Sequence, residues 1–239
     1  MIIRDKVRQD IDLLPEGTVV GPADFDIPLR YRATLVKALN QYESAGILKR
    51  LSKGRYYKPR KSRFGELPPS ESEIIREFLE RKGDVIGYIT GTRAFARLAL
   101  TTQISSAILI GSNIPRRPVV RGQYKISFLY QPNPIGKDDV PLLVILDALR
   151  LIKEIPGATP DEAIRQTAVW INLLSAVEQK QLLDLSKAYQ PYVRAQVGAI
   201  YDFLEVPTSD LQNTINPGSR YRLGITSSAL PTARNWNIL

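Results

Sequence analysis

Residues 30–57 read RYRATLVKALNQYESAGILKRLSKGRYY, and this stretch decides the fold of the N-terminal part. At about 100° per residue, a helix over residues 30–45 gathers one packing face. That face consists of Tyr31, Leu35, Ala38, Leu39 and Tyr42. Gly46 is expected to end the helix, because glycine is favoured just after a helix C-terminus. Residues 47–51 and 56–58 then predict two short strands joined by a loop that contains Gly54.

The opposite face of this helix is polar and cationic, with Arg30, Thr34, Lys37 and Gln41 lying within about 60° of one another. Upstream, apolar residues at helical spacing predict a helix over residues 3–14. An extended segment at 18–20 and a brief helical turn at 23–25 follow it. This order of elements, closed by a basic hairpin, is that of a winged helix-turn-helix, whose last helix enters the major groove.

Basic charge is concentrated in one segment. Residues 30–63 hold eleven basic side chains and one acidic side chain, whereas residues 64–239 hold 19 and 17, and the whole chain has a net charge of +9. Such a segment favours duplex DNA as partner, since lysine and arginine neutralise phosphates and reach base edges. The candidate DNA-binding residues are Arg30, Arg32, Thr34, Lys37, Gln41, Lys53, Arg55, Arg60, Lys61 and Arg63. Two alternatives are a solvated surface helix with a basic hairpin and a winged helix that binds protein.

The charge partition predicts two domains, 1–63 and 70–239, separated by a proline- and glycine-containing linker at 64–69. In the second domain, a helix that opens at Ser70 is followed by strands and a short helix up to residue 130. Four helical segments then run to residue 203, and a tail after Pro207 is expected to pack on the domain. The predicted fold class is therefore α+β, an N-terminal winged helix-turn-helix followed by a mixed α/β domain that ends in a helical bundle.

The composition excludes much catalytic chemistry. The chain contains no cysteine and no histidine, which removes disulfides, Cys/His zinc sites and Ser-His-Asp triads. The turn at Gly111-Ser112 has no spaced pair of acids nearby to hold the metal ions of a nucleotidyltransferase. We therefore expect no enzyme, no cofactor and no metal. No apolar run of about 18 residues is present, so we expect a cytoplasmic protein without a membrane partner.

Several phrases, in order along nearly the whole chain, resemble the AbiEi-type antitoxins of bacterial type IV toxin–antitoxin systems. They are the hairpin phrase at 48–57, the linker phrase at 62–70, the pair GYITG at 87–91 and LALTTQ at 98–103, LDAL at 146–149 and AYQPYVRA at 188–195. The resemblance implies an N-terminal winged helix that represses its own operon. It also implies a C-terminal domain that opposes a co-encoded nucleotidyltransferase toxin without a stable complex. The tail after Asn216-Pro217 is longer than the family pattern, so the resemblance leaves the role of residues 205–239 open.

The sequence therefore predicts a non-enzymatic antitoxin that binds its own promoter. The alternative is a winged-helix transcription regulator whose C-terminal domain senses a ligand or a protein and has no toxin partner. The residues leave open the operator sequence, the oligomeric state, the target of the toxin and whether antagonism requires direct contact.

Overall fold

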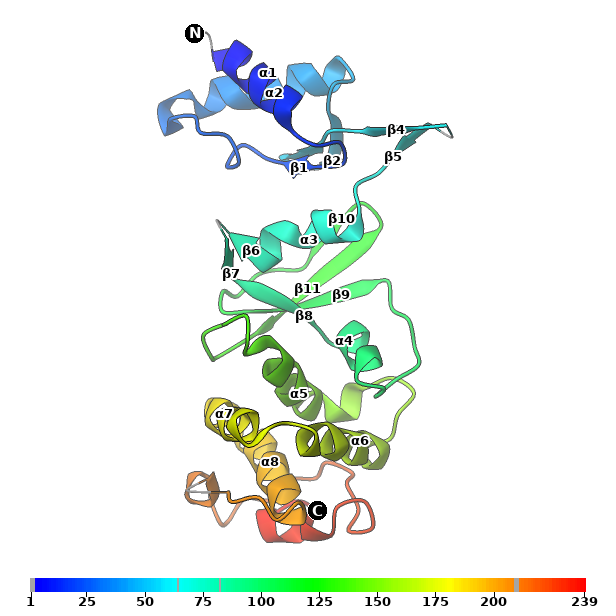
Figure 1. Ribbon diagram of the computed structural model, residues 1–239, viewed down its shortest axis with the longest axis vertical. Coiled ribbons are helices and arrows are strands. Elements are labelled where there is room, and N and C mark those ends of the chain that lie inside the picture. Colours follow the sequence, from blue (N-terminus) through cyan, green and yellow to red (C-terminus); the bar gives the residue numbers. More distant parts are fainter. Residues whose placement is uncertain (1–2, 64, 82, 209–210) are drawn as a thin grey trace. The chain divides into compact units, whose positions relative to one another are not determined.

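The computed structural model describes residues 3–63, 65–81, 83–208 and 211–239 (Figure 1). The chain is a mixed α+β protein, which confirms the predicted class at this level. Among the described residues, no helix combines the length and apolar character that crossing a membrane requires.

Internal contacts divide the chain into two compact units. The first comprises Met1–Phe78 and Val119–Lys125, and the second comprises Leu79–Pro118 and Ile126–Leu239. This division differs from the predicted boundary at 64–69, because side chains C-terminal to that boundary bond to the N-terminal sheet, as shown below. Residue 64 of the predicted linker lies outside the described residues.

The two main helices of the first unit follow the apolar spacing of the sequence. α1 (Ile3–Leu13) buries Val7 and Ile11. α2 (Arg32–Ser44) is preceded by a 3-10 turn, η1 (Leu29–Tyr31), and Gly46 has a φ of +73°, the left-handed conformation expected after a helix. The helical turn predicted at 23–25 is wrong. The chain there forms a single hydrogen-bonded turn, in which Asp24 N donates to Gly21 O at 3.0 Å.

A three-stranded antiparallel sheet packs on these helices. Its strands are β1 (Val19–Val20), β2 (Lys49–Ser52) and β3 (Arg55–Tyr57), in the order β1-β3-β2. The predicted hairpin is therefore confirmed as the β2–β3 hairpin. Leu39 of α2, Leu48 and Tyr56 are buried in one core with the apolar face of α1.

Part of the predicted linker is a second hairpin. β4 (Arg60–Ser62) pairs with β5 (Gly65–Leu67), with Arg60 opposite Leu67. The turn closes because Gly65 has a φ of +105° and its carbonyl oxygen accepts a hydrogen bond of 2.7 Å from Ser62 Oγ. α3 (Glu71–Leu79) follows, one residue after the predicted helix start at Ser70. The chain continues into the pair β6 (Glu80–Arg81) and β7 (Asp84–Val85), and residue 82 lies outside the described residues.

The second unit is built on β8 (Gly87–Thr90) and β9 (Ala107–Ser112), which pair antiparallel with Tyr88 opposite Gly111. A Cβ at Gly111 would lie 2.4 Å from the Tyr88 ring, so this position needs glycine for packing. In this sheet β9 lies between β8 and β11 (Tyr124–Tyr130), and residues Val119–Arg121 form the short strand β10, which belongs to the first unit. The short helix α4 (Thr92–Arg97) follows β8.

Helices make up most of the C-terminal part, as predicted. They are α5 (Val140–Arg150), η2 (Ile152–Glu154), α6 (Pro160–Asn172), α7 (Ala176–Ser186) and α8 (Pro191–Phe203). Thr159 and Ser175 begin α6 and α7 with complete capping boxes, in which each hydroxyl accepts from the backbone of Glu162 or Glu178. α5 is buried from Leu142 to Leu149, so it forms the centre of the second unit.

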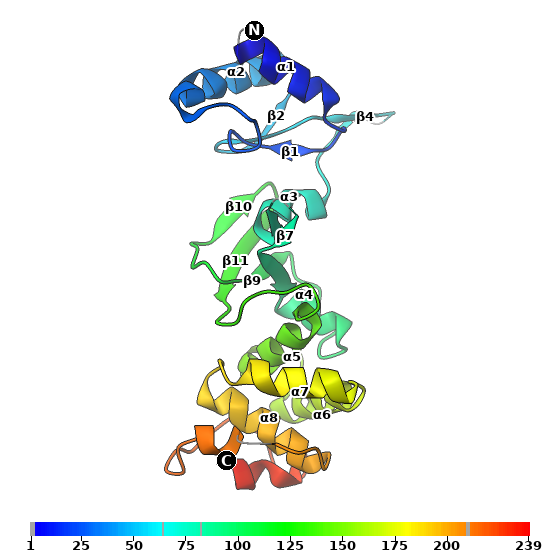
Figure 2. The same ribbon diagram turned by 60° about the vertical axis from the view of Figure 1, so that its left-hand side comes forward.

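The C-terminal tail packs against α8 (Figures 1 and 2), as expected for residues after Pro207; residues 209–210 lie outside the described residues. It contains η3 (Leu211–Thr214) and η4 (Pro231–Trp236). Trp236 is 2% exposed, and its indole nitrogen donates to Asp202 Oδ2 at 2.6 Å. A Cβ at Gly198 would lie 2.3 Å from the same ring, so glycine lets the tail lie directly on the helix.

Candidate nucleic-acid interface

The outward face of α2 presents the side chains that the sequence pattern selects. Arg32, Thr34, Lys37 and Gln41 are all exposed, as is Arg30 in η1 just before the helix. Tyr31, which the pattern places on the packing face, is 39% exposed. It lies in η1, and the guanidinium of Arg30 stands 4.9 Å from its ring centre. The start of the helix therefore presents an arginine supported by an aromatic ring.

The inward face fixes the orientation of α2. Leu35, Ala38, Leu39 and Tyr42 are buried, and the hydroxyl of Tyr42 donates to the carbonyl oxygen of Arg4 at 2.7 Å. Since the packing face is held by α1 and the sheet, the side chains on the other face point to solvent from a rigid support.

An open cleft of about 620 Å³ runs along the outward side of α2, lined by Ala33, Val36, Lys37, Asn40, Gln41, Ser44 and Ala45. Small side chains alternate there with longer polar ones. This composition lets a surface approach the helix closely while lysine and glutamine remain available as hydrogen-bond donors.

Asn40 joins α2 to the β2–β3 hairpin, a role that the sequence pattern does not reveal. Its Oδ1 accepts a hydrogen bond of 2.6 Å from the Tyr56 hydroxyl and one of 2.8 Å from Arg50 Nη2. Arg50 also pairs with Glu43 at 3.2 Å, and hydrogen bonding to Glu43 is the main cause that raises the pKa of Arg50. Arg50 is therefore committed to contacts within the protein.

Arg55 is placed differently from the other candidates. The sequence suggests that it neutralises phosphate on an exposed hairpin, yet its side chain is only 23% exposed and pairs with both Asp24 and Glu77. Its charge is balanced inside the first unit, because the fold brings two carboxylates from distant segments against it. Arg55 is therefore not available to neutralise a phosphate.

Lys53 and the β4–β5 hairpin supply the remaining cationic surface. Lys53 is exposed at the loop of the β2–β3 hairpin, and Arg60, Lys61 and Arg63 are exposed on the second hairpin. Within the described ranges, none of these four forms an ion pair. Lys49 differs, because it pairs with Glu66 across the two hairpins, and hydrogen bonding to Glu66 raises the pKa of Lys49.

The second unit holds a buried polar cluster around Asp147, which is 0% exposed. The hydroxyls of Tyr88 and Tyr189 donate to its two carboxylate oxygens at 2.8 and 3.0 Å, and Gln131 Nε2 donates to both hydroxyls. Burial raises the pKa of Asp147 to about 6, against the opposing effect of these hydrogen bonds. A single acid within the apolar run of α5 is the only sequence signal of this cluster.

The described part of the chain contains no group of three acidic residues that could hold a metal ion. The Asp147 cluster consists of one carboxylate whose oxygens already accept two tyrosine hydroxyls. The surface formed by η1, α2 and the two hairpins gathers exposed cationic and polar side chains and is the candidate functional site.

Residues 6–181, about three quarters of the chain, match a protein family described as "Family of unknown function (DUF6088)". The chain belongs to the DUF6088 family. The DUF6088 match contains every candidate DNA-binding residue named above, and it ends before α8 and the tail that packs on it.

No curated protein matches this DUF6088 chain in sequence. Among solved structures, the crystal structure of the RV2827C protein from Mycobacterium tuberculosis is similar at 15% sequence identity and a TM-score of 0.38. That similarity covers 91% of this chain and 83% of the mycobacterial chain.

Proposed function

We propose that the first unit of this protein is a winged helix-turn-helix that binds duplex DNA, with α2 as the reading helix. The order α1, β1, η1, α2, β2 and β3, with the sheet order β1-β3-β2, supports this proposal, and a hydrogen-bonded turn at Gly21–Asp24 and η1 stand where the short helix was expected. In such a module the last helix lies in the major groove and the hairpin contacts the backbone beside it.

The observation that carries the proposal is the outward face of η1 and α2. Arg30, Arg32 and Lys37 are exposed there, and none of them forms an ion pair with an acidic side chain of the described residues. Arginine and lysine reach the acceptors of guanine in the major groove, and Gln41 offers the amide that suits adenine. A helix face that contacts only solvent more commonly carries acidic residues between its basic residues.

The two hairpins extend this surface. Lys53, Arg60, Lys61 and Arg63 are exposed cations without an ion pair in the described ranges, and they suit contacts to phosphate. Phosphate contacts position a protein on the duplex and make the affinity depend on salt. Base contacts by α2 would then supply the specificity.

We further propose that the protein is a cytoplasmic antitoxin. In this proposal the first unit represses its own promoter, and the second unit opposes a co-encoded nucleotidyltransferase toxin without a stable complex. The resemblance of the sequence phrases to type IV antitoxins supports this role. The second unit also has its own large core around α5, so it is able to act as a separate functional part.

Titration of the full chain against its own promoter and against a scrambled duplex tests the DNA proposal. If about five phosphates are neutralised, log K is expected to fall with log salt at a slope of about −4 to −5. Lys37→Ala is expected to cost about 1–3 kcal/mol on the promoter and less on the scrambled duplex. Lys180→Ala, an exposed lysine on α7, is the matched control. A flat salt response would contradict the proposal.

Co-expression with the neighbouring toxin separates the antitoxin from a regulator that has no toxin. Full-length protein carrying Arg32→Ala and Lys37→Ala is expected to lose repression of a promoter reporter and still rescue growth. Protein levels must be equal in both assays, since lost abundance imitates lost function. Failure of the unchanged chain to rescue growth would favour the regulator whose second unit senses a ligand or protein.

A further inference from the structure

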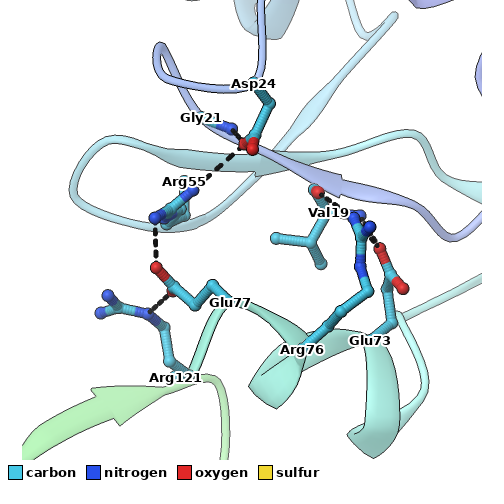
Figure 3. A network of polar contacts seen from close by, with 8 residues as sticks. All are labelled: Val19, Gly21, Asp24, Arg55, Glu73, Arg76, Glu77 and Arg121. Carbon is cyan, nitrogen blue, oxygen red and sulfur yellow. Dashed lines mark hydrogen bonds and ion pairs between the residues drawn. The ribbon is translucent and has the colours of Figure 1, made fainter. Parts of the chain in front are cut away.

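Four side chains of alternating charge lie in a row beside the β2–β3 hairpin (Figure 3). Asp24 Oδ2 lies 3.2 Å from Arg55 Nη1, the other terminal nitrogen of Arg55 pairs with Glu77, and Glu77 Oε1 lies 3.3 Å from Arg121 Nε. The Arg55, Glu77 and Arg121 side chains are 23%, 21% and 16% exposed. Two acids and two bases balance, so this row leaves no surplus charge for a phosphate.

Besides the loop that holds Asp24, the row ties together three segments that are far apart in the sequence. Arg55 belongs to β3, Glu77 to α3 and Arg121 to β10. Gly21 allows the close approach at one end, because a Cβ there would lie 2.7 Å from Arg55 Nη1 and 2.9 Å from the carbonyl oxygen of Gly54. The hairpin is thus held beside its turn, where Arg55 pairs with Ser52, by groups that lie outside residues 1–63.

α3 makes a second tie to the same sheet (Figure 3). Glu73 Oε1 accepts a hydrogen bond of 2.8 Å from Val19 N, and Arg76 Nη2 donates to Val19 O at 3.4 Å. Val19 lies on β1, an edge strand whose outward peptide groups would otherwise face solvent. Side chains of α3 therefore take the place of a further strand.

Residues 119–125 complete this arrangement. Arg121 lies over the ring of Phe78, with its guanidinium carbon 5.8 Å from the ring centre. A Cβ at Gly122 would lie 3.6 Å from Leu51 of β2, so this segment also reaches the other strand of the hairpin. The segment belongs to the first unit by its contacts, whereas the chain on both sides of it belongs to the second unit.

We infer that Glu77 and Arg121 are positioning residues of the DNA-binding surface, and that β10 supports this surface through Arg121 and thereby affects its affinity for DNA. This inference rests on the proposed function. Glu77 and Arg121 hold Arg55, and Arg55 holds the β2–β3 hairpin that presents Lys53. Loss of either side chain leaves every exposed cation of α2 in place and frees the hairpin to change its angle to the helix.

DNA titration of the full chain tests the inference through charge-matched pairs of variants. Arg121→Gln and Lys125→Gln each remove one positive charge from residues 119–125, but Lys125 is exposed and lies outside the row. Glu77→Gln and Glu80→Gln form the corresponding acidic pair. We expect Arg121→Gln and Glu77→Gln to raise the Kd for the promoter about three- to tenfold, with an unchanged salt slope. Both control variants should stay within twofold of the unchanged chain.

A distance measurement gives a readout that needs no DNA. Since the chain has no cysteine, Gln41→Cys and Lys53→Cys place two spin labels selectively on α2 and on the hairpin loop. Arg121→Gln is expected to broaden the distance distribution between the labels, and Lys125→Gln to leave it narrow. Arg121→Lys, which keeps the charge, should restore most of the affinity and the narrow distribution.

Each outcome supports or overturns the inference. A salt slope reduced by about one unit in Arg121→Gln would show a direct phosphate contact and overturn the positioning role. Equal affinities and equal distance distributions in Arg121→Gln and Lys125→Gln would also overturn it. Absence of DNA binding by the unchanged chain would overturn the proposed function and this inference with it, and the distance distributions would still show whether the row positions the hairpin.

Discussion

The ammonium nitrogen of Lys58 lies 2.7 Å from the carbonyl oxygen of Leu14. It also donates to the carbonyl oxygens of Ile11 and Asp12, at 3.1 and 2.8 Å. Ile11 and Asp12 lie in the last turn of α1 and Leu14 directly follows the helix, where carbonyl groups have no partner within the helix. Lys58 belongs to the basic segment, but its ammonium group stabilises the C-terminal end of α1 and is not available to contact DNA.

Lys58→Ala is therefore expected to lower the free energy of unfolding of the first unit by about 1–2 kcal/mol. It should leave the salt slope of DNA binding unchanged. Hydrogen exchange of α1 amides measures the first effect, and DNA titration measures the second. Lys61→Ala is the control with the opposite pattern, since Lys61 is exposed on the β4–β5 hairpin. A reduced salt slope for Lys58→Ala would contradict this assignment.

Asp147 gives the second unit a pH dependence of known sign. Burial raises its pKa from 3.8 to about 6, so the folded state binds more protons than the unfolded state between about pH 4 and 6. Its contribution to stability therefore falls as the pH rises through this window.

Between pH 4 and pH 7, the unchanged chain should lose about 2–3 kcal/mol of stability relative to Asp147→Asn. Urea unfolding followed by tryptophan fluorescence measures this difference. The chain has two tryptophans, Trp170 and Trp236, and both lie in the second unit. Parallel pH profiles for the two proteins would show that Asp147 does not carry the dependence.

Gly198→Ala tests the packing of the tail on α8. The added methyl group would overlap the Trp236 ring, so we expect a loss of about 1–3 kcal/mol and a red shift of tryptophan emission. Gly218→Ala is the control, because Gly218 is exposed and its nearest neighbour is a surface asparagine side chain. Equal stability of the two variants would contradict the close packing of Trp236 on Gly198.

Fragment stability tests the boundary of the first unit. A fragment of residues 1–79 is expected to melt at a higher temperature than one of residues 1–63, measured by circular dichroism. The longer fragment keeps Glu73 and Arg76, which bond to the edge of β1 at Val19. If both fragments melt at the same temperature, α3 does not stabilise the sheet and the predicted boundary at 64–69 is the better one.

The sequence pattern was sufficient to predict a segment's structure wherever that structure depends on residues close together in the chain. The apolar spacing of 35, 39 and 42 places the buried face of α2, and Gly46 ends the helix as expected. Thr159 and Ser175 begin two helices through local pattern alone, because a capping box is completed within four residues. The exposed candidates on α2 follow from the same periodicity.

Only the tertiary structure shows which basic side chains are bound within the protein and which segments belong to the first unit. By sequence, Lys53, Arg55 and Lys58 are equivalent members of one basic segment. In the structure Lys53 is exposed, Arg55 pairs with Asp24 and Glu77, and Lys58 caps α1. Proline and glycine near residue 65 predict a linker between two domains. They do not show that side chains of α3 bond to β1.

The sequence by itself determined the helices, the hairpin and the concentration of basic charge, since these depend on periodicity and composition within a few residues. The tertiary structure alone decided which cations remain free and that Arg121 supports the hairpin. An ion pair depends on which distant side chains the fold brings within about 4 Å, and neither partner carries a local signal of the other.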